Sequence, residues 1–345
     1  MTAMNIRDRK PLFPLVLLLL GSMSLLSSCH RDDDPVKNPL QTGIPIRLSA
    51  TSDWPQLTRA DVIDEDNYNE QTFAVWGLYQ EAPDPLVFDG TSVWWDVEIG
   101  DSGAWTYESD EEPVRYWSVG NYSFAAVMPS GALPVSEVSW EPTTLTFDPS
   151  FDLSQNQRDI MIALAEEEYT TDDMSSDQTK SVTLSFGHQL SLLNFTVSND
   201  IDENSTISIK SLRVYGLHSS ASMWSSEDGW YLDELLSDPF VSVPVTSDLE
   251  YGDQPLTLIE NLLAFPETDA QMIVEVTYTE SRDGAENPTA EITKATAPIS
   301  VSWEPAKVYT YPLTINKSEI IFINEPTVTE WQDGGNAGGI TIKSN

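Results

Sequence analysis

The chain has 345 residues, with 55 acidic residues against 17 basic ones and a formal net charge of −38. So acidic a surface repels the phosphates of nucleic acids and the headgroups of anionic lipids, which excludes both as favoured partners. The length exceeds that of one ordinary domain, so two domains with separate cores are expected.

The first thirty residues have the organisation of an export signal. A basic start over residues 7–10 precedes an apolar run from Leu12 to Leu20, which is too short for a stable transmembrane helix. Small residues then lead to Leu26-Ser27-Ser28-Cys29, which resembles the bacterial lipobox, in which the cysteine thiol receives a lipid. We predict a signal peptide over residues 1–28 and lipidation at Cys29; an unlipidated secretory peptide is the alternative.

Cys29 is the only cysteine, so one copy of the chain can form neither a disulfide framework nor a cysteine-ligated zinc site. Each buried methylene of an acyl chain adds roughly 0.8 kcal/mol, so several chains would hold the protein on a membrane. The acidic residues that follow, within 30–34, resemble the export tag that sends lipoproteins of Bacteroidetes-type bacteria to the cell surface; a solvated spacer is the alternative. We predict an acidic tether over residues 29–43.

The rest of the sequence alternates with a period of two, which predicts an all-β fold. In the segment from Ile44 to Ala50, the residues Ile44, Ile46, Leu48 and Ala50 fall on one face. Pro45 within it suits an edge strand, because proline cannot donate a ladder hydrogen bond. Short alternating runs separated by turn clusters are typical of β-sandwiches.

Two observations predict the domain organisation. The run Val138-Ser139-Trp140-Glu141-Pro142 recurs at 301–305, as two related domains in tandem would produce, although a match of five residues is weak support. The polar stretch from Thr170 to Gln178 is the best linker candidate. We predict an N-terminal β-sandwich over residues 44–180 and a C-terminal one over 181–345.

Several short motifs, in this order, resemble the fimbrillin-like family of Bacteroidetes, the subunits of type V pili. They are Leu57-Thr58-Arg59-Ala60, Phe73-Ala74-Val75-Trp76-Gly77-Leu78-Tyr79, Arg115-Tyr116-Trp117, Tyr122-Ser123-Phe124-Ala125-Ala126, Asp159-Ile160-Met161, Leu184-Ser185-Phe186-Gly187-His188-Gln189-Leu190, Trp303-Glu304-Pro305, Tyr309-Thr310-Tyr311 and Val328-Thr329-Glu330-Trp331. The resemblance implies two transthyretin-like β-sandwich domains. It also implies a lipoprotein precursor from which an arginine-specific protease removes an N-terminal strand, so that a neighbouring subunit's C-terminal strand can enter the groove.

The segment from Ile44 to Ala50 is the candidate for the displaced strand. At ~1.5–3 kcal/mol for each large apolar side chain, its loss would leave a groove unfavourable by very roughly 5–10 kcal/mol, which a strand of the same pattern could relieve.

Arg59 is the predicted cleavage residue, because it follows that strand and no other Lys or Arg occurs before Arg115. An ordinary loop arginine is the alternative, and Arg47 is a second, less accessible candidate. The predicted donor is the segment from Thr327 to Lys343, with Ile340 and Ile342 as its apolar residues. The alternative is a final strand packed in its own domain.

Catalytic chemistry finds little support in the sequence. The three histidines are His30, His188 and His218, and His188 fits a packed histidine better than a catalytic base. Residues 64–67 and Asp172-Asp173 could hold calcium weakly, but a solvated acidic loop is the default. We therefore expect no enzyme activity, metal site or cofactor.

The tryptophans support a second functional hypothesis, a surface lipoprotein that binds a glycan or host ligand without polymerising. Trp224 and Trp230 lie in a polar turn and are the predicted ligand contacts, although tryptophans in β-sandwiches more often fill the core. The leading hypothesis is a structural or adhesive fimbrial subunit. It would be anchored in the outer membrane by its lipid, exposed at the cell surface, and incorporated with other subunits into a fimbrium after processing.

Overall fold

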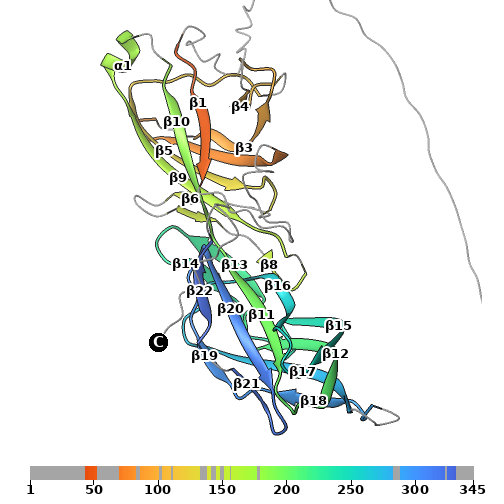
Figure 1. The fold of residues 1–345 in the computed structure, drawn as a ribbon. Coiled ribbons are helices and arrows are strands. Elements are labelled where there is room, and N and C mark those ends of the chain that lie inside the picture. Colours follow the sequence, from red (N-terminus) through yellow and green to blue (C-terminus); the bar gives the residue numbers. More distant parts are fainter. Residues whose placement is uncertain are drawn as a thin grey trace, which may run out of the picture. The chain divides into compact units, whose positions relative to one another are not determined.

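The computed structural model describes residues 43–52, 70–82, 86–100, 103–109, 112–132, 138–140, 145–147, 151–155, 157–176, 179–282, 288–322 and 325–331. All of them belong to one unit of the chain that begins at Thr42. Almost every regular element is a β-strand, which confirms the all-β prediction (Figure 1). No helix in these ranges is long and apolar enough to cross a bilayer.

The first sheet has the strand order β1-β10-β9-β5-β2-β3-β4 within the described ranges. β1 pairs parallel with β10, whereas the other neighbours are antiparallel. Figure 1 shows β1 beside β10 at the end of this sheet. The strands are β1 (Arg47–Ser52), β2 (Thr72–Tyr79), β3 (Leu86–Asp96), β4 (Ala104–Thr106), β5 (Gly120–Met128), β9 (Met161–Tyr169) and β10 (Ser181–His188).

Two further sheets form a β-sandwich whose inward side chains share one core. One has β11 and β20 as a parallel central pair, with β16 beside β11 and both β21 and β22 beside β20. Its strands are β11 (Ser191–Asn199), β16 (Leu256–Ala264), β20 (Lys307–Ile315), β21 (Ile320–Phe322) and β22 (Thr327–Glu330).

The opposing sheet is antiparallel and is built on the long strands β12 and β17. Alternate residues of β17 face the core, since Met272, Val274, Val276 and Tyr278 are all buried. The strands are β12 (Ser205–Tyr215), β15 (Val241–Glu250), β17 (Ala270–Arg282), β18 (Ile292–Ala295) and β19 (Ile299–Val301).

A smaller sheet contains the tryptophan-bearing hairpin of β13 and β14. Phe147 and Phe151, from the short strands paired with β13, enter the same core as the sandwich, and so do Trp76 and Val127 from the first sheet. The strands are β6 (Val138–Trp140), β7 (Leu145–Phe147), β8 (Phe151–Asp152), β13 (Ser220–Ser225) and β14 (Gly229–Leu232).

The polar stretch predicted as a linker contains a short helix, α1 (Thr171–Ser176). Thr170 caps it, because the Asp173 amide donates to the Thr170 hydroxyl (3.2 Å) and the Thr170 amide donates to the Asp173 carboxylate (2.8 Å). This stretch connects β9 with β10, two neighbours in one sheet. The chain therefore changes sheet after His188, and the domain boundary near residue 180 stays a prediction.

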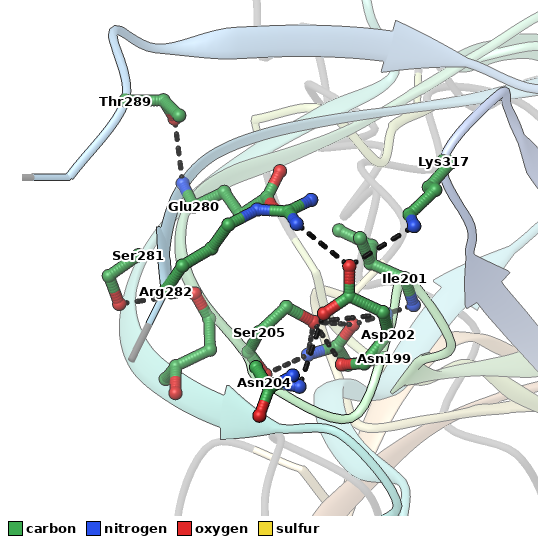
Figure 2. A network of polar contacts seen from close by, with 11 residues as sticks. Asn199, Ile201, Asp202, Asn204, Ser205, Glu280, Ser281, Arg282, Thr289 and Lys317 are labelled. Atoms are coloured by element: carbon green, nitrogen blue, oxygen red, sulfur yellow. Dashed lines mark hydrogen bonds and ion pairs between the residues drawn. The ribbon is translucent and has the colours of Figure 1, made fainter. Parts of the chain in front are cut away.

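A polar network closes the turn between β11 and β12 (Figure 2). One carboxylate oxygen of Asp202 binds the Arg282 guanidinium at 2.9 Å and the Lys317 ammonium at 3.1 Å. The Lys317 contact and the hydrogen bond from the Asn204 amide hold the pKa of Asp202 below its ordinary value. This carboxylate therefore ties the ends of three strands, because Arg282 is the last residue of β17, and Asp202 and Lys317 lie just beyond β11 and β20.

Candidate functional site

The segment predicted to be displaceable alternates between core and surface. Ile46 and Leu48 are 0% and 5% exposed, and Ile44 and Ala50 pack partly buried against the same cluster. The Arg47 side chain, on the other face, is 41% exposed. Alternation at a sheet edge therefore gives this segment one apolar face and one polar face, as a half-buried strand requires.

The first residues of the segment pair with one piece of backbone. The Ile46 amide donates to the Arg115 carbonyl at 2.8 Å, and the Trp117 amide donates to the Ile44 carbonyl at 3.0 Å. Pro45 forms an isolated antiparallel bridge with Tyr116 between these two bonds. Proline fits there because its missing amide hydrogen is not needed by that ladder.

From Arg47 onward the segment pairs with a different strand. β1 runs parallel to β10, with Arg47 opposite Ser181 and Ser52 opposite Phe186. Within the described ranges, each part of the segment thus has one ladder partner, and β1 stands at the end of its sheet. An end strand can leave without breaking any other strand pair.

Tyr107 joins this edge to the other end of the sheet. This residue lies directly after β4. Its hydroxyl donates to the Ile46 carbonyl at 2.9 Å and accepts from the Arg115 amide at 3.1 Å. Burial raises the pKa of the Tyr107 phenol, so the neutral, donating form persists at neutral pH. Arg47 pairs with Glu108 on the surface, where a half-exposed ion pair contributes at most about 1 kcal/mol.

The part of the core that β1 covers, called the floor below, is apolar and partly aromatic. Val182, Leu184 and Phe186 of β10 are buried in the same cluster as Ile46 and Leu48. Trp117 stacks on Tyr169 with ring planes 4° apart, and its indole N–H donates to the Lys180 carbonyl at 3.2 Å. Removal of β1 would expose this floor to water.

Several predicted site residues lie outside the described ranges: Cys29, Arg59, Ile340, Ile342 and the acidic residues 64–67. Their roles stay predictions. The first part of the predicted donor segment is described, and β22 pairs antiparallel with β20, Lys307 lying opposite Glu330. Residues 327–331 therefore follow the alternative, a strand packed in its own sheet.

Both described histidines are bound to carboxylates. His188 Nδ1 lies 2.8 Å from Asp159 Oδ2, and its ring, 4% exposed, stacks on Trp331, so a substrate cannot reach it. His218 Nδ1 lies 2.7 Å from Glu267 Oε2 and is more accessible. The prediction that His188 is a packed residue is confirmed.

Acidic side chains in the described part of the chain form no group of three or more potential metal ligands. Asp173, considered above for calcium, is engaged in capping α1 and lies 3.8 Å from the Lys180 ammonium. Hydrogen bonds from the Thr170 amide and hydroxyl lower the pKa of Asp173.

The two tryptophans predicted as ligand contacts face each other across the β13–β14 hairpin. Trp224 is only 6% exposed, so the expectation of an exposed residue is wrong for it. Its indole N–H donates to the Gln189 side chain, and that of Trp230 donates to the Gln189 carbonyl. Trp230 is half-buried. Trp105 and Trp117 are core residues, as the core alternative expected.

Comparisons with known proteins agree with this fold. A model of the fimbrillin-like family matches residues 58–331. A fimbrial protein from Bacteroides vulgatus, 14% identical, has a similar structure with a TM-score of 0.52, and the match covers 84% of this chain and 100% of that one. A candidate cell adhesion protein from Bacteroides uniformis is 17% identical, with a TM-score of 0.46 and coverage of 84% and 98%. No curated protein matches the sequence.

The family match runs from the residues just after β1 to Trp331, at the end of β22, and so covers well over half of the chain. The structural likeness to the Bacteroides vulgatus protein supports the same fold independently of sequence identity. This chain belongs to the fimbrillin-like family.

Proposed function

We propose that the protein is a structural or adhesive subunit of cell-surface fimbriae, exported as a lipoprotein and assembled by protease-triggered strand exchange. The observation that carries the proposal is the place of β1. This strand stands at the end of its sheet, covers an apolar floor and is the first strand of the described chain. Membership of a family of structural and adhesion proteins, not enzymes, agrees with this role.

The chain connectivity makes β1 separable by a single cut. Residues 53–71 connect its end at Ser52 to the start of β2 at Thr72, and Arg59 lies within this connection. Hydrolysis of the peptide bond after Arg59 would leave β1 held only by non-covalent contacts. The fragment that departs would carry Cys29 and its lipid.

The energy of the vacated groove would favour a replacement strand. Three large apolar side chains of the segment face it, and at ~1.5–3 kcal/mol for each side chain their loss would leave the groove unfavourable by the same roughly 5–10 kcal/mol. The donor would come from the C-terminal residues of another copy, beyond Trp331. There Ile340 and Ile342 alternate with Thr341 and Lys343, the pattern that a half-buried edge strand requires.

The proposal is tested on the chain from His30 onward, without lipid, treated with an arginine-specific protease. We expect one early cut after Arg59, loss of the N-terminal fragment and a ladder of SDS-resistant oligomers. The matched control is Arg59→Lys, which keeps the positive charge, resists this protease and regains cleavage with trypsin. Arg47→Gln removes the second candidate cleavage residue, which lies within β1. A cut that persists in this variant therefore lies beyond β1.

A second pair of variants tests the donor. Ile340→Asp with Ile342→Asp should leave cleavage unchanged and abolish the ladder, because charges cannot enter an apolar groove. Thr341→Asp alters the opposite face and should still polymerise. If cleaved protein remains monomeric and retains the β1 fragment through gel filtration, strand exchange is not the assembly mechanism.

A further inference from the structure

A cavity of about 410 Å³ lies beside the β13–β14 hairpin, among strands that do not include β1. Its volume lies in the range of small-molecule sites. The residues that define its chemistry combine aromatic rings with polar groups: Trp224, Trp230, Trp303, Gln189, His218 and Asp228. The full lining comes from five separate stretches of the chain, so the cavity exists only in the folded protein.

Trp230 is the most exposed of the three tryptophans in the lining. Trp224 and Trp303 are buried in the lining, at 6% and 3% exposed, whereas Trp230 is half-buried. Phe265 packs edge-on to Trp230 at 5.1 Å, Phe151 stacks on the Trp230 ring with centroids 6.1 Å apart, and the Trp230 indole N–H is bound to the Gln189 carbonyl at 2.9 Å. These contacts hold the ring in one orientation, as a stacking surface requires.

Asp228 supplies an exposed carboxylate next to that ring. The Tyr231 hydroxyl donates to its Oδ2 at 2.6 Å, and the Asp228 amide donates to the Ser225 hydroxyl at 2.9 Å, which together fix the turn. A carboxylate oriented in this way can accept hydrogen bonds from ligand hydroxyls, and charge-assisted bonds of this kind are stronger than neutral ones.

The remaining polar groups are suited to a neutral ligand. Glu267 is buried, and both its oxygens are engaged by His218, one by the backbone amide (3.0 Å) and one by the ring. The outer edge of His218 and the exposed Thr268 hydroxyl can each donate or accept. None of the described residues that line the cavity is Lys or Arg, so an anionic ligand would meet the Asp228 carboxylate without a lysine or arginine to balance its charge.

We infer that this cavity binds a neutral saccharide, with one pyranose ring stacked on Trp230 and its hydroxyls bound to Asp228, His218 and Thr268. Saccharides present both an apolar face of ring C–H groups and a rim of hydroxyls that donate and accept. A cationic side chain would match Trp230 and Asp228, but it would leave the donor group of the Thr268 hydroxyl unused. The site does not depend on strand exchange.

Isothermal titration of the chain from His30 onward, uncleaved, tests this inference. The probes are the methyl glycosides of galactose, mannose and N-acetylglucosamine. N-acetylneuraminic acid is the anionic probe, and Nα-acetyl-lysine amide, whose side-chain ammonium is free, is the cationic one. We expect saturable binding of at least one neutral glycoside and none of either charged probe.

Variants then assign the contact residues. Asp228→Asn should weaken binding about tenfold, as expected for the loss of one charge-assisted hydrogen bond. Trp230→Ala should weaken glycoside binding by a similar factor of about ten. Trp230→Phe keeps an aromatic ring and should retain part of the binding, and it replaces the alanine variant in the test if that variant fails to fold. Trp94→Phe, on β3, is the matched control and should bind normally.

Three outcomes would overturn the inference. The first is no saturable binding of any neutral glycoside by correctly folded protein. The second is binding that survives both Asp228→Asn and the Trp230 variants unchanged. The third is preferential binding of Nα-acetyl-lysine amide, which would make the cavity a site for cationic side chains. None of them bears on protease-triggered assembly, which is measured on cleaved protein.

Discussion

The indole of Trp331 stacks on the imidazole of His188, with ring centroids 4.0 Å apart and planes 11° apart. His188 ends β10 of the first sheet, and Trp331 follows β22 of the sandwich, so the stack joins elements from two sheets. The Trp331 amide also donates to the Ala306 carbonyl at 2.8 Å. The C-terminal segment is therefore fastened as far as Trp331, and the donor that we propose would have to come from residues beyond it.

Replacing Trp331 by alanine should destabilise the protein strongly. The side chain is 3% exposed, and removal of a buried tryptophan costs about 3–5 kcal/mol. Urea denaturation measures the change, and hydrogen exchange should accelerate at the amides of β22. Trp331→Phe keeps a stacking ring and should lose less. Equal stability of the alanine variant and the wild type would show that the stack does not fasten this segment.

Truncation of Ile46 should weaken the hold on β1. The residue is fully buried, and an isoleucine-to-alanine change in a core costs about 2–5 kcal/mol. The matched control is Thr51→Ala on the exposed face of the same strand, which removes one hydrogen bond to Ser185 at 3.2 Å and should change stability by less than about 1 kcal/mol. Thermal unfolding compares the two, and a larger loss for Thr51→Ala would contradict the described orientation of β1.

Two glycines of nearly equal backbone conformation should respond differently to alanine. Gly216 has φ +82° and Gly252 has φ +78°, which costs an L-residue roughly 1–2 kcal/mol at either position. An added Cβ at Gly252 meets open space, but at Gly216 it would lie 2.0 Å from the Gln271 carbonyl oxygen.

Gly252→Ala should therefore fold with a modest loss, whereas Gly216→Ala should be much less stable or fail to fold. Chemical denaturation and soluble yield distinguish the two. Similar stabilities for both variants would mean that the backbone around Gly216 and Gln271 can move apart at little cost.

The contribution of Asp202 should depend on pH. Its pKa is lowered in the folded state, first by Lys317 and then by the Asn204 amide, with Arg282 adding to the effect. The stabilisation is thus fully present above the unfolded pKa of about 3.9 and is lost as pH falls through the lower folded value. Asp202→Asn should reduce stability at pH 6 and make much less difference at pH 3. A difference that does not change with pH would exclude this charge effect.

The apolar periodicity of the strands was readable from the sequence. Val182, Leu184 and Phe186 alternate on β10, and Ile46 and Leu48 alternate with Arg47 on the segment leading into β1, because neighbouring residues of a strand point to opposite faces. The fold class and the family followed from this alternation together with short motifs. The short helix α1 was missed, although the pair Thr170 and Asp173 is a capping signal that could have revealed it.

Pairing and burial were not readable in the same way. Hydrogen bonds between strands are made by backbone groups that are the same in every residue except proline, so the identities of Arg47 and Ser52 do not specify β10 as the partner. Trp224 and Trp230 lie close together in the sequence, yet one is buried and the other is half-buried, because residues from distant stretches, such as Gln189 and Phe265, pack around them.

The sequence by itself determined which residues face a core, that the protein is all-β and which family it belongs to, because side-chain polarity and short motifs are local properties. Only the tertiary structure decided that β1 pairs with β10, that β22 is fastened through Trp331, and that a cavity forms beside Trp230. These features depend on contacts between residues far apart in the chain. Packing between distant segments fixes their geometry. The order of residues along one strand gives no information about that packing.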